Sequence, residues 1–296
     1  MTDQGLSWDL LADLQLLLQF HFMQNALLVG TIVAVLAGAV GYFVVLRGQS
    51  FVAHMLSQVG FPGAAGAVLV HASPIAGLIV FCITAALGVG AVGGRLDAGR
   101  RSESAAVGTI LAFSLGLGLL FTRLYSGTAQ GVYAFLFGTI LGITDRDLLI
   151  TLVTAGLALA VLVVIGRPLF FASVDPDVAQ ARGVPVRILS FAFLVLLALG
   201  VAEAVQVVGT LLIFALLVAP AAAAQRVTAR PLQGFVLTVG LSLLFTWLGL
   251  AAAYFSNRPA GFLITTFAFG TYVLIRIAIG AKRTAPAGRG RLMAQP

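Results

Sequence analysis

Residues 148–205 read LLITLVTAGLALAVLVVIGRPLFFASVDPDVAQARGVPVRILSFAFLVLLALGVAEAV. Two apolar runs, 148–166 and 188–205, flank a polar interval at 167–187. A helix that crosses the hydrocarbon core of a bilayer needs about 20 mostly apolar residues, and each run approaches this length. The stretch therefore predicts two membrane-spanning helices joined by a polar loop on one side of the membrane.

The composition extends this interpretation to the whole chain. Of its 296 residues, 60% are hydrophobic and 9% are charged, whereas a soluble domain has about 25% charged residues. Cys82 is the only cysteine, which excludes a disulfide scaffold. The basic residues that give the net charge of +7 are scattered between apolar runs, so they indicate membrane orientation and no nucleic-acid partner.

The apolar windows predict an all-α, polytopic transmembrane helix bundle with about nine spans and one short re-entrant segment. The window at 51–70 is the weakest, because it contains His54, Gln58 and Pro62. We expect a membrane domain at 22–280, with spans at 22–46, 51–70, 74–94, 104–122, 148–166, 188–205, 208–225, 232–255 and 262–280.

The twelve apolar residues Val132 to Ile143 decide the topology, because they are too few for an ordinary span. If this segment enters the membrane and returns to the same side, thirteen basic residues lie on one face and three on the other. If it crosses fully, the division becomes ten against six. The positive-inside rule therefore favours a re-entrant segment, an outer N-terminus and a cytoplasmic C-terminus in the plasma membrane of a prokaryote.

The two ends of the chain differ from the spans. Residues 1–21 form the expected outer N-terminal segment, in which the run from Leu6 to Phe20 is typical of an interfacial amphipathic helix. Residues 281–296 are rich in Gly, Pro and Arg and are expected to form a disordered cytoplasmic tail.

The polar interval predicts a short helix at 175–183 on the cytoplasmic face. Asp175 can cap the free backbone N–H groups, Pro176 suits the first helical position, and Asp177 complements the positive end of the helix dipole. Arg182 falls in the last turn, and Gly183 can adopt the left-handed conformation that ends a helix. A rigid, well-capped helix suits a docking element, although a structured linker is also compatible with this pattern.

The segment DPDVAQARGVPVR, residues 175–187, resembles the coupling loop of the metal-uptake ABC permease family, which imports manganese, zinc and iron. Three other stretches are similar to segments of the same family in the expected order. They are GYFVVLRGQSFVAHMLSQVGFPGAAGA at 41–67, YAFLFGTILGITDRDL at 133–148 and VGTLLIFALLVAPAAAAQR at 208–226.

The resemblance implies a permease that forms a homodimer with a second copy, couples through Asp175 to Gly183 to separate ABC ATPase subunits, and receives its substrate from an extracytoplasmic binding protein. The substrate would be a divalent transition metal ion (manganese, zinc or iron), with no permanently bound cofactor. The chain has no G-x-x-x-x-G-K-[ST] motif, so we expect no ATP hydrolysis by this route and no enzyme activity in this subunit.

Candidate metal ligands are His54, Gln58 and Glu203. Members of the family usually carry an Asp and, four residues later, a His on the second helix, and here these positions hold His54 and Gln58. Imidazole remains a good ligand for these metals, whereas the Gln amide is a weak oxygen donor. Glu203 could restore the missing negative charge, or it could be a carboxylate at the outer end of its helix. Pro220 predicts a kink that could serve as a gate or be merely structural.

Three alternatives remain, one within the importer class and two from other classes. An importer of a chelated metal, such as an iron-siderophore, remains open because the charged pair is missing. A secondary transporter that needs no ATPase is disfavoured, because such proteins usually carry more ionisable residues within the bilayer. A membrane-embedded enzyme is disfavoured because no paired carboxylates and no HExxH motif occur.

Overall fold

The computed structural model describes the chain except for residues 1–18, 94–99, 125–142, 211–212, 257 and 285–296. The described part folds into ten helices and contains no strand. Eight of these helices are long and apolar enough to cross a membrane, and a ninth apolar helix is shorter. The predicted all-α, multi-span fold is confirmed.

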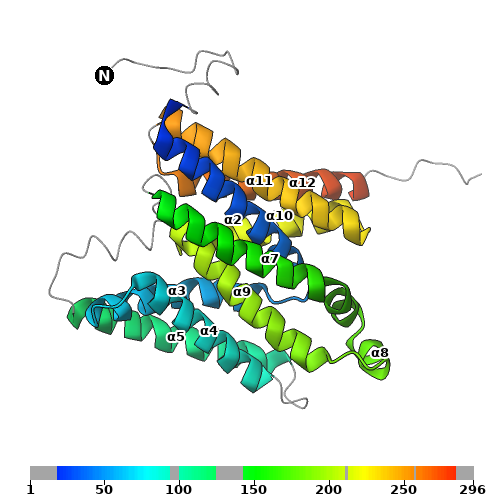
Figure 1. Ribbon diagram of the computed structural model, residues 1–296. Coiled ribbons are helices and arrows are strands. Elements are labelled where there is room, and N and C mark those ends of the chain that lie inside the picture. The colour runs from blue at the N-terminus through cyan, green and yellow to red at the C-terminus, as the bar shows by residue number, and fades with distance from the viewer. Residues whose placement is uncertain (1–18, 94–99, 125–142, 211–212, 257, 285–296) are drawn as a thin grey trace, which may run out of the picture.

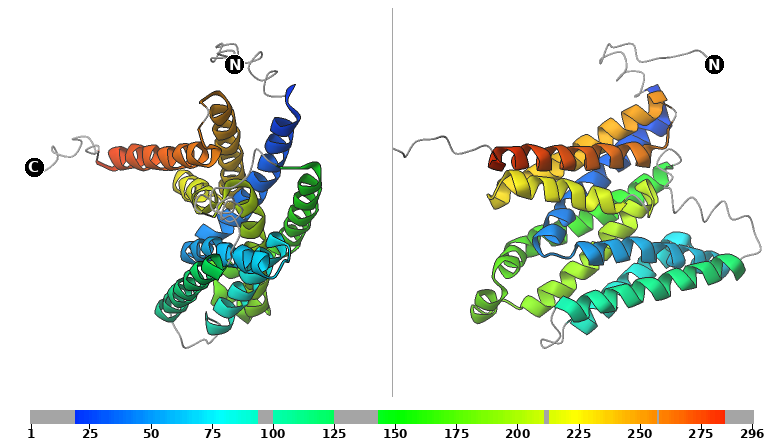
Figure 2. Two further views of the ribbon diagram at one scale, coloured as in Figure 1. Left: turned by 90° about the vertical axis from the view of Figure 1, so that its left-hand side faces the viewer. Right: turned by 180° about the vertical axis from the view of Figure 1, so that it is seen from behind.

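The helices form three groups (Figures 1 and 2). The central group contains α2 (His21–Leu46), α7 (Asp145–Val174) and α9 (Val186–Val208). On one side of it pack α3 (Ser50–Leu69), α4 (Pro74–Gly93) and α5 (Arg100–Leu124). On the other side pack α10 (Ile213–Val227), α11 (Pro231–Ser256) and α12 (Ala260–Thr284). The short helix α8 (Pro176–Ala181) connects α7 to α9.

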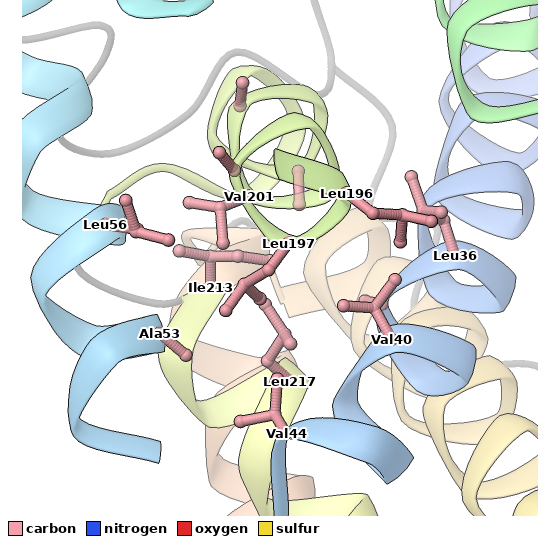
Figure 3. Packing of buried hydrophobic residues seen from close by; sticks show 14 of the residues in the cluster. Leu36, Val40, Val44, Ala53, Leu56, Leu196, Leu197, Val201, Ile213 and Leu217 are labelled. Carbon is pink, nitrogen blue, oxygen red and sulfur yellow. The ribbon is translucent and has the colours of Figure 1, made fainter. Parts of the chain in front are cut away.

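The apolar core lies where α2, α3, α9 and α10 meet (Figure 3). Leu36 and Val40 of α2 point toward Leu196 and Leu197 of α9, and Ile213 of α10 lies between them and α3. In the most apolar window of α2, 72% of the residues are buried, against 17% in α5. Helix α2 is therefore central, and α5 lies at the surface of the bundle.

Glycine allows the helices to approach closely at two places. A Cβ at Gly63 of α3 would lie 2.5 Å from the carbonyl oxygen of Gly77 in α4. In α2, a Cβ at Gly41 would collide with the carbonyl oxygen of Leu217 in α10. These contacts are the close packing that small residues permit between membrane helices.

Two boundaries differ from the prediction. Helix α7 continues through Pro168 to Val174, so the polar interval shortens to the residues around α8. Helix α9 ends at Gly209, whose φ of 88° is incompatible with helix, and α10 begins at Ile213. The expected span at 208–225 is therefore a helix of 15 residues, shorter than an ordinary span.

The segments with the least certain topology lie mostly outside the described residues. They are the N-terminal segment 1–18, most of the re-entrant candidate at 132–143, and the tail from 285. The helices that flank residues 125–142 are described. Helix α5 ends, and α7 begins, at the end of the bundle where His21 opens α2 and contacts Asp145 (Figure 1). The two described helices on either side of this segment therefore meet the same end of the bundle, and the re-entrant prediction itself lies outside the described residues.

Candidate functional site

A polar stripe runs along α3, the helix that carries two of the candidate ligands. From Val52 to Ala65, His54, Gln58 and Phe61 are partly exposed, and every other residue is buried. Their spacing of four and three residues places them on one face of the helix. Contact with lipid is costly for His and Gln, so a polar stripe of this kind indicates a pathway or a protein-covered surface.

The stripe lies between α10 and α5. The ring of Phe214, in α10, packs edge-on against the imidazole of His54, with a centroid distance of 5.0 Å and an interplanar angle of 72°. At the other end, Phe61 packs against Gly118 of α5. Nδ1 of His54 is buried and has no hydrogen-bond partner in the described part of the chain. We call His54, Gln58 and Phe214 the α3–α10 site.

Glu203 lies elsewhere in the bundle. Its side chain is 2% exposed and faces α7, where its carboxyl group reaches the hydroxyls of Thr151 and Thr154. One carboxyl oxygen, Oε2, is buried without a partner among the described residues. By helical rise, Glu203 is about 25 Å from the start of α9, whereas His54 is about 6 Å from the start of α3. Both helices start at the end of the bundle where α8 lies. The structure therefore does not bring Glu203 together with His54 and Gln58.

A three-residue cluster of His, Cys, Asp and Glu that could hold a metal ion is absent from the described residues. His21 contacts Asp145 across 3.0 Å at the end of the bundle where α2 and α7 begin, but both side chains are exposed. Cys82 is buried, and its Sγ lies 3.5 Å from the carbonyl oxygen of Leu56, so it is a packing residue. A metal ion at the α3–α10 site would therefore be held by His54 and the Gln58 amide.

The predicted capped helix between α7 and α9 is present as α8. Oδ1 of Asp175 accepts a hydrogen bond of 3.0 Å from the backbone N–H of Val178, and Pro176 occupies the first helical turn. At the other end, Gly183 has a φ of 80°, and the N–H of Val184 donates to the carbonyl of Ala179 at 3.0 Å. These bonds form a Schellman motif, so both ends of α8 are fixed by its own sequence.

Helix α8 protrudes from the end of the bundle opposite the start of α2 (Figure 1). All of its residues except Ala179 are exposed, including the apolar Val178 at 43%. A cavity of about 870 Å³ lies beside it, between the α2–α3 turn, the ends of α4 and α5, and the start of α9. Arg47 and Arg187 are among the residues that line this cavity.

Arg47 joins three helices at this end of the bundle. Its Nη2 donates to Ser190 of α9 at 2.7 Å, and its Nη1 donates to Ser173 of α7 at 3.1 Å. Its guanidinium group also lies 5.4 Å from the ring centroid of Phe193. The C-terminal ends of α2 and α7 and the start of α9 are therefore fixed relative to one another next to α8.

The sequence profile of the ABC 3 transport family matches residues 19–279, from just before α2 to within α12. This chain belongs to the ABC 3 transport family. The resemblance that the sequence showed to metal-uptake ABC permeases is confirmed, and the chain is a multi-pass protein of the plasma membrane.

Several relatives of this chain are named for manganese transport. The chain is 33% identical over 243 residues to the manganese import system permease protein ScaB of Streptococcus parasanguinis, which covers 82% of this chain and 85% of the relative. It is 31% identical to the manganese transport system membrane protein MntC of Halalkalibacterium halodurans, over 72% of each chain. Its fold resembles that of PsaBC from Streptococcus pneumoniae, solved in complex with Fab, with a TM-score of 0.79, 30% identity, and coverage of 90% of this chain and 94% of that chain.

Two residues of this ABC 3 family member were not singled out by the sequence. Phe214 lies in an apolar run, where nothing distinguishes it from its neighbours. Arg47 was interpreted only as an orientation charge, and its hydrogen bonds join residues more than 120 positions apart. Arg47 lies in the short connection between two expected spans, 22–46 and 51–70. This position was the one sign in the sequence that Arg47 could join helices at one end of the bundle.

Proposed function

We propose that this chain is the permease subunit of an ATP-driven importer of a divalent transition metal ion, with manganese as the first candidate and zinc or iron as alternatives. The observation that carries the proposal is the similarity over most of the chain to permeases named for manganese transport. Helix α8 supports coupling to an ATPase, because a short, exposed helix with both ends capped suits a docking element.

The two ends of the bundle would bind different partner proteins. Separate ATPase subunits would bind α8, where exposed Val174 and Val178 give an apolar surface outside the predicted spans. An extracytoplasmic binding protein would deliver the ion to the opposite end. A second permease copy would cover the polar stripe of α3, so that His54 and Gln58 line a pathway between the two copies instead of facing lipid.

Transport in this proposal is alternating access, driven from α8. ATP binding and hydrolysis in the partner would move α8, and α7 and α9 would carry the movement because they continue directly from its two ends. His54 would supply an imidazole nitrogen to the passing ion, and Gln58 would supply a neutral oxygen. A site without a carboxylate binds a divalent cation weakly, which suits an ion that must also be released.

Reconstitution tests this proposal. The permease, its ATPase partner and its binding protein would be placed in proteoliposomes, and accumulation of radioactive manganese would be followed with ATP or with a non-hydrolysable analogue. We expect uptake only with ATP, reduced by competing manganese more strongly than by zinc or iron. Uptake that proceeds without the ATPase subunit would show that the ATP-driven mechanism is wrong.

Import of a chelated metal is the second candidate. It is favoured by the α3–α10 site, which offers one imidazole and one amide and no carboxylate. The same proteoliposomes would be supplied with iron bound to a siderophore. Uptake of the intact chelate, with no uptake of free manganese, would decide for this candidate.

A further inference from the structure

Phe214 and His54 meet because α10 is held firmly against α2. Gly41 of α2 packs directly on the backbone of Leu217, and Nε2 of Gln225 donates to the carbonyl of Tyr42 at 3.1 Å. These contacts anchor the middle and the end of α10, while Phe214 is its second residue. Pro220 lies between the anchored end and Phe214.

The contact between the two rings is specific. A centroid distance of 5.0 Å and an angle of 72° are typical of the edge-to-face geometry that aromatic rings favour. Histidines that bind metals normally have the second ring nitrogen fixed by a hydrogen bond, which sets the orientation of the imidazole. Nδ1 of His54 is buried without such a partner in the described residues, so a different contact must hold the ring.

We propose that Phe214 is a positioning residue for His54. Contact with its ring takes the place of the missing hydrogen bond, fixes the imidazole, and leaves one nitrogen of His54 for the transported ion. The inference rests on the proposed function, because it assigns the ion to His54. If Phe214 positions His54, the affinity for the ion depends on the position of α10 relative to α3.

The first experiment compares three variants in the reconstituted complex. Phe214→Leu removes the ring but keeps an apolar side chain, and Phe214→Tyr keeps the ring. Phe269→Leu is the matched control, because Phe269 is 66% exposed on α12, away from the α3–α10 site. Loss of an edge-to-face pair predicts a KM for manganese raised about two- to tenfold in Phe214→Leu. We expect kcat to change little, and KM to stay near the wild-type value in Phe214→Tyr and Phe269→Leu.

The second experiment observes His54 directly. The chain has three histidines, so ring signals of isotope-labelled histidine can be assigned with one His54 variant. We expect Phe214→Leu to shift the His54 signals and to leave those of His21 and His71 in place. Manganese ions, which are paramagnetic, should broaden the His54 signals of the wild-type protein.

The outcomes separate the inference from the proposed function. If manganese leaves the His54 signals of the wild-type protein sharp, His54 does not bind the ion and the inference is wrong, whereas ATP-dependent uptake in the proteoliposomes still decides the proposed function. If the signals broaden but Phe214→Leu has the wild-type KM, only the role of Phe214 is wrong. A fall in kcat with unchanged KM would likewise overturn it, because that result indicates less active protein and no change in ligand position.

Discussion

The cap of α8 gives the most direct test of the docking role. In Asp175→Ala, the hydrogen bond of 3.0 Å that the N–H of Val178 donates to Oδ1 of Asp175 is lost. Loss of an N-cap costs about 0.5–2 kcal/mol, and typically about 1. The helix has six residues, too few to be stable without its caps and its contacts with the bundle. A cost of about 1 kcal/mol lowers the ratio of folded to unfolded α8 roughly fivefold.

The expected result is a loss of affinity for the ATPase subunit of up to roughly fivefold, which is reached when α8 of the unbound permease is mostly unfolded. The assay is equilibrium binding of the purified ATPase to the permease in lipid nanodiscs, together with hydrogen exchange at the amide of Val178. Asp175→Asn is the matched control, because the Asn side chain also caps but carries no charge.

Two results would refute this reasoning. Wild-type affinity together with faster exchange in Asp175→Ala would show that the ATPase does not need a formed α8. An equal loss in Asp175→Asn would show that the charge of Asp175 matters and the cap does not.

Three further predictions concern the bundle. His54→Ala should abolish ATP-dependent uptake while binding of the ATPase subunit stays intact; retained uptake would remove His54 from the pathway. Gly63→Ala should lower the thermal unfolding midpoint in detergent by forcing α3 from α4, at a cost of about 1–3 kcal/mol, whereas Gly156→Ala, in open space, should not lower it. Arg47→Met should lower the midpoint, because each lost hydrogen bond from a charged group costs about 1.5–3 kcal/mol. Arg187 is exposed, so Arg187→Met should change the midpoint little. If both variants lower the midpoint equally, Arg47 does not hold the three helices together.

Most of the fold could be predicted because the bilayer imposes a simple length rule. Each expected span coincides with a helix, and the caps of α8 could be predicted because Asp175, Pro176 and Gly183 act through neighbouring backbone groups. The end of α9 at Gly209 was missed, because an apolar run hides a change of backbone direction.

The candidate site was harder to predict, because it depends on which helices touch. Gln58 and His54 share a face by their spacing, which is a local property. The direction in which Glu203 points cannot be read from neighbouring residues, since it depends on how α9 is rotated against α7. The pairing of His54 with Phe214 likewise joins residues 160 positions apart through packing that no periodicity reveals.

The self-contained capping of α8 has an evolutionary consequence. Since Asp175 and Gly183 define this helix within nine consecutive residues, its shape depends little on side chains deep in the bilayer. If the ATPase binds α8 and the ion passes α3, as proposed, then mutations in α3 that change ion preference can accumulate without disturbing ATPase binding. Under this proposal, related permeases can differ in the ion that they transport while they bind the same ATPase subunit.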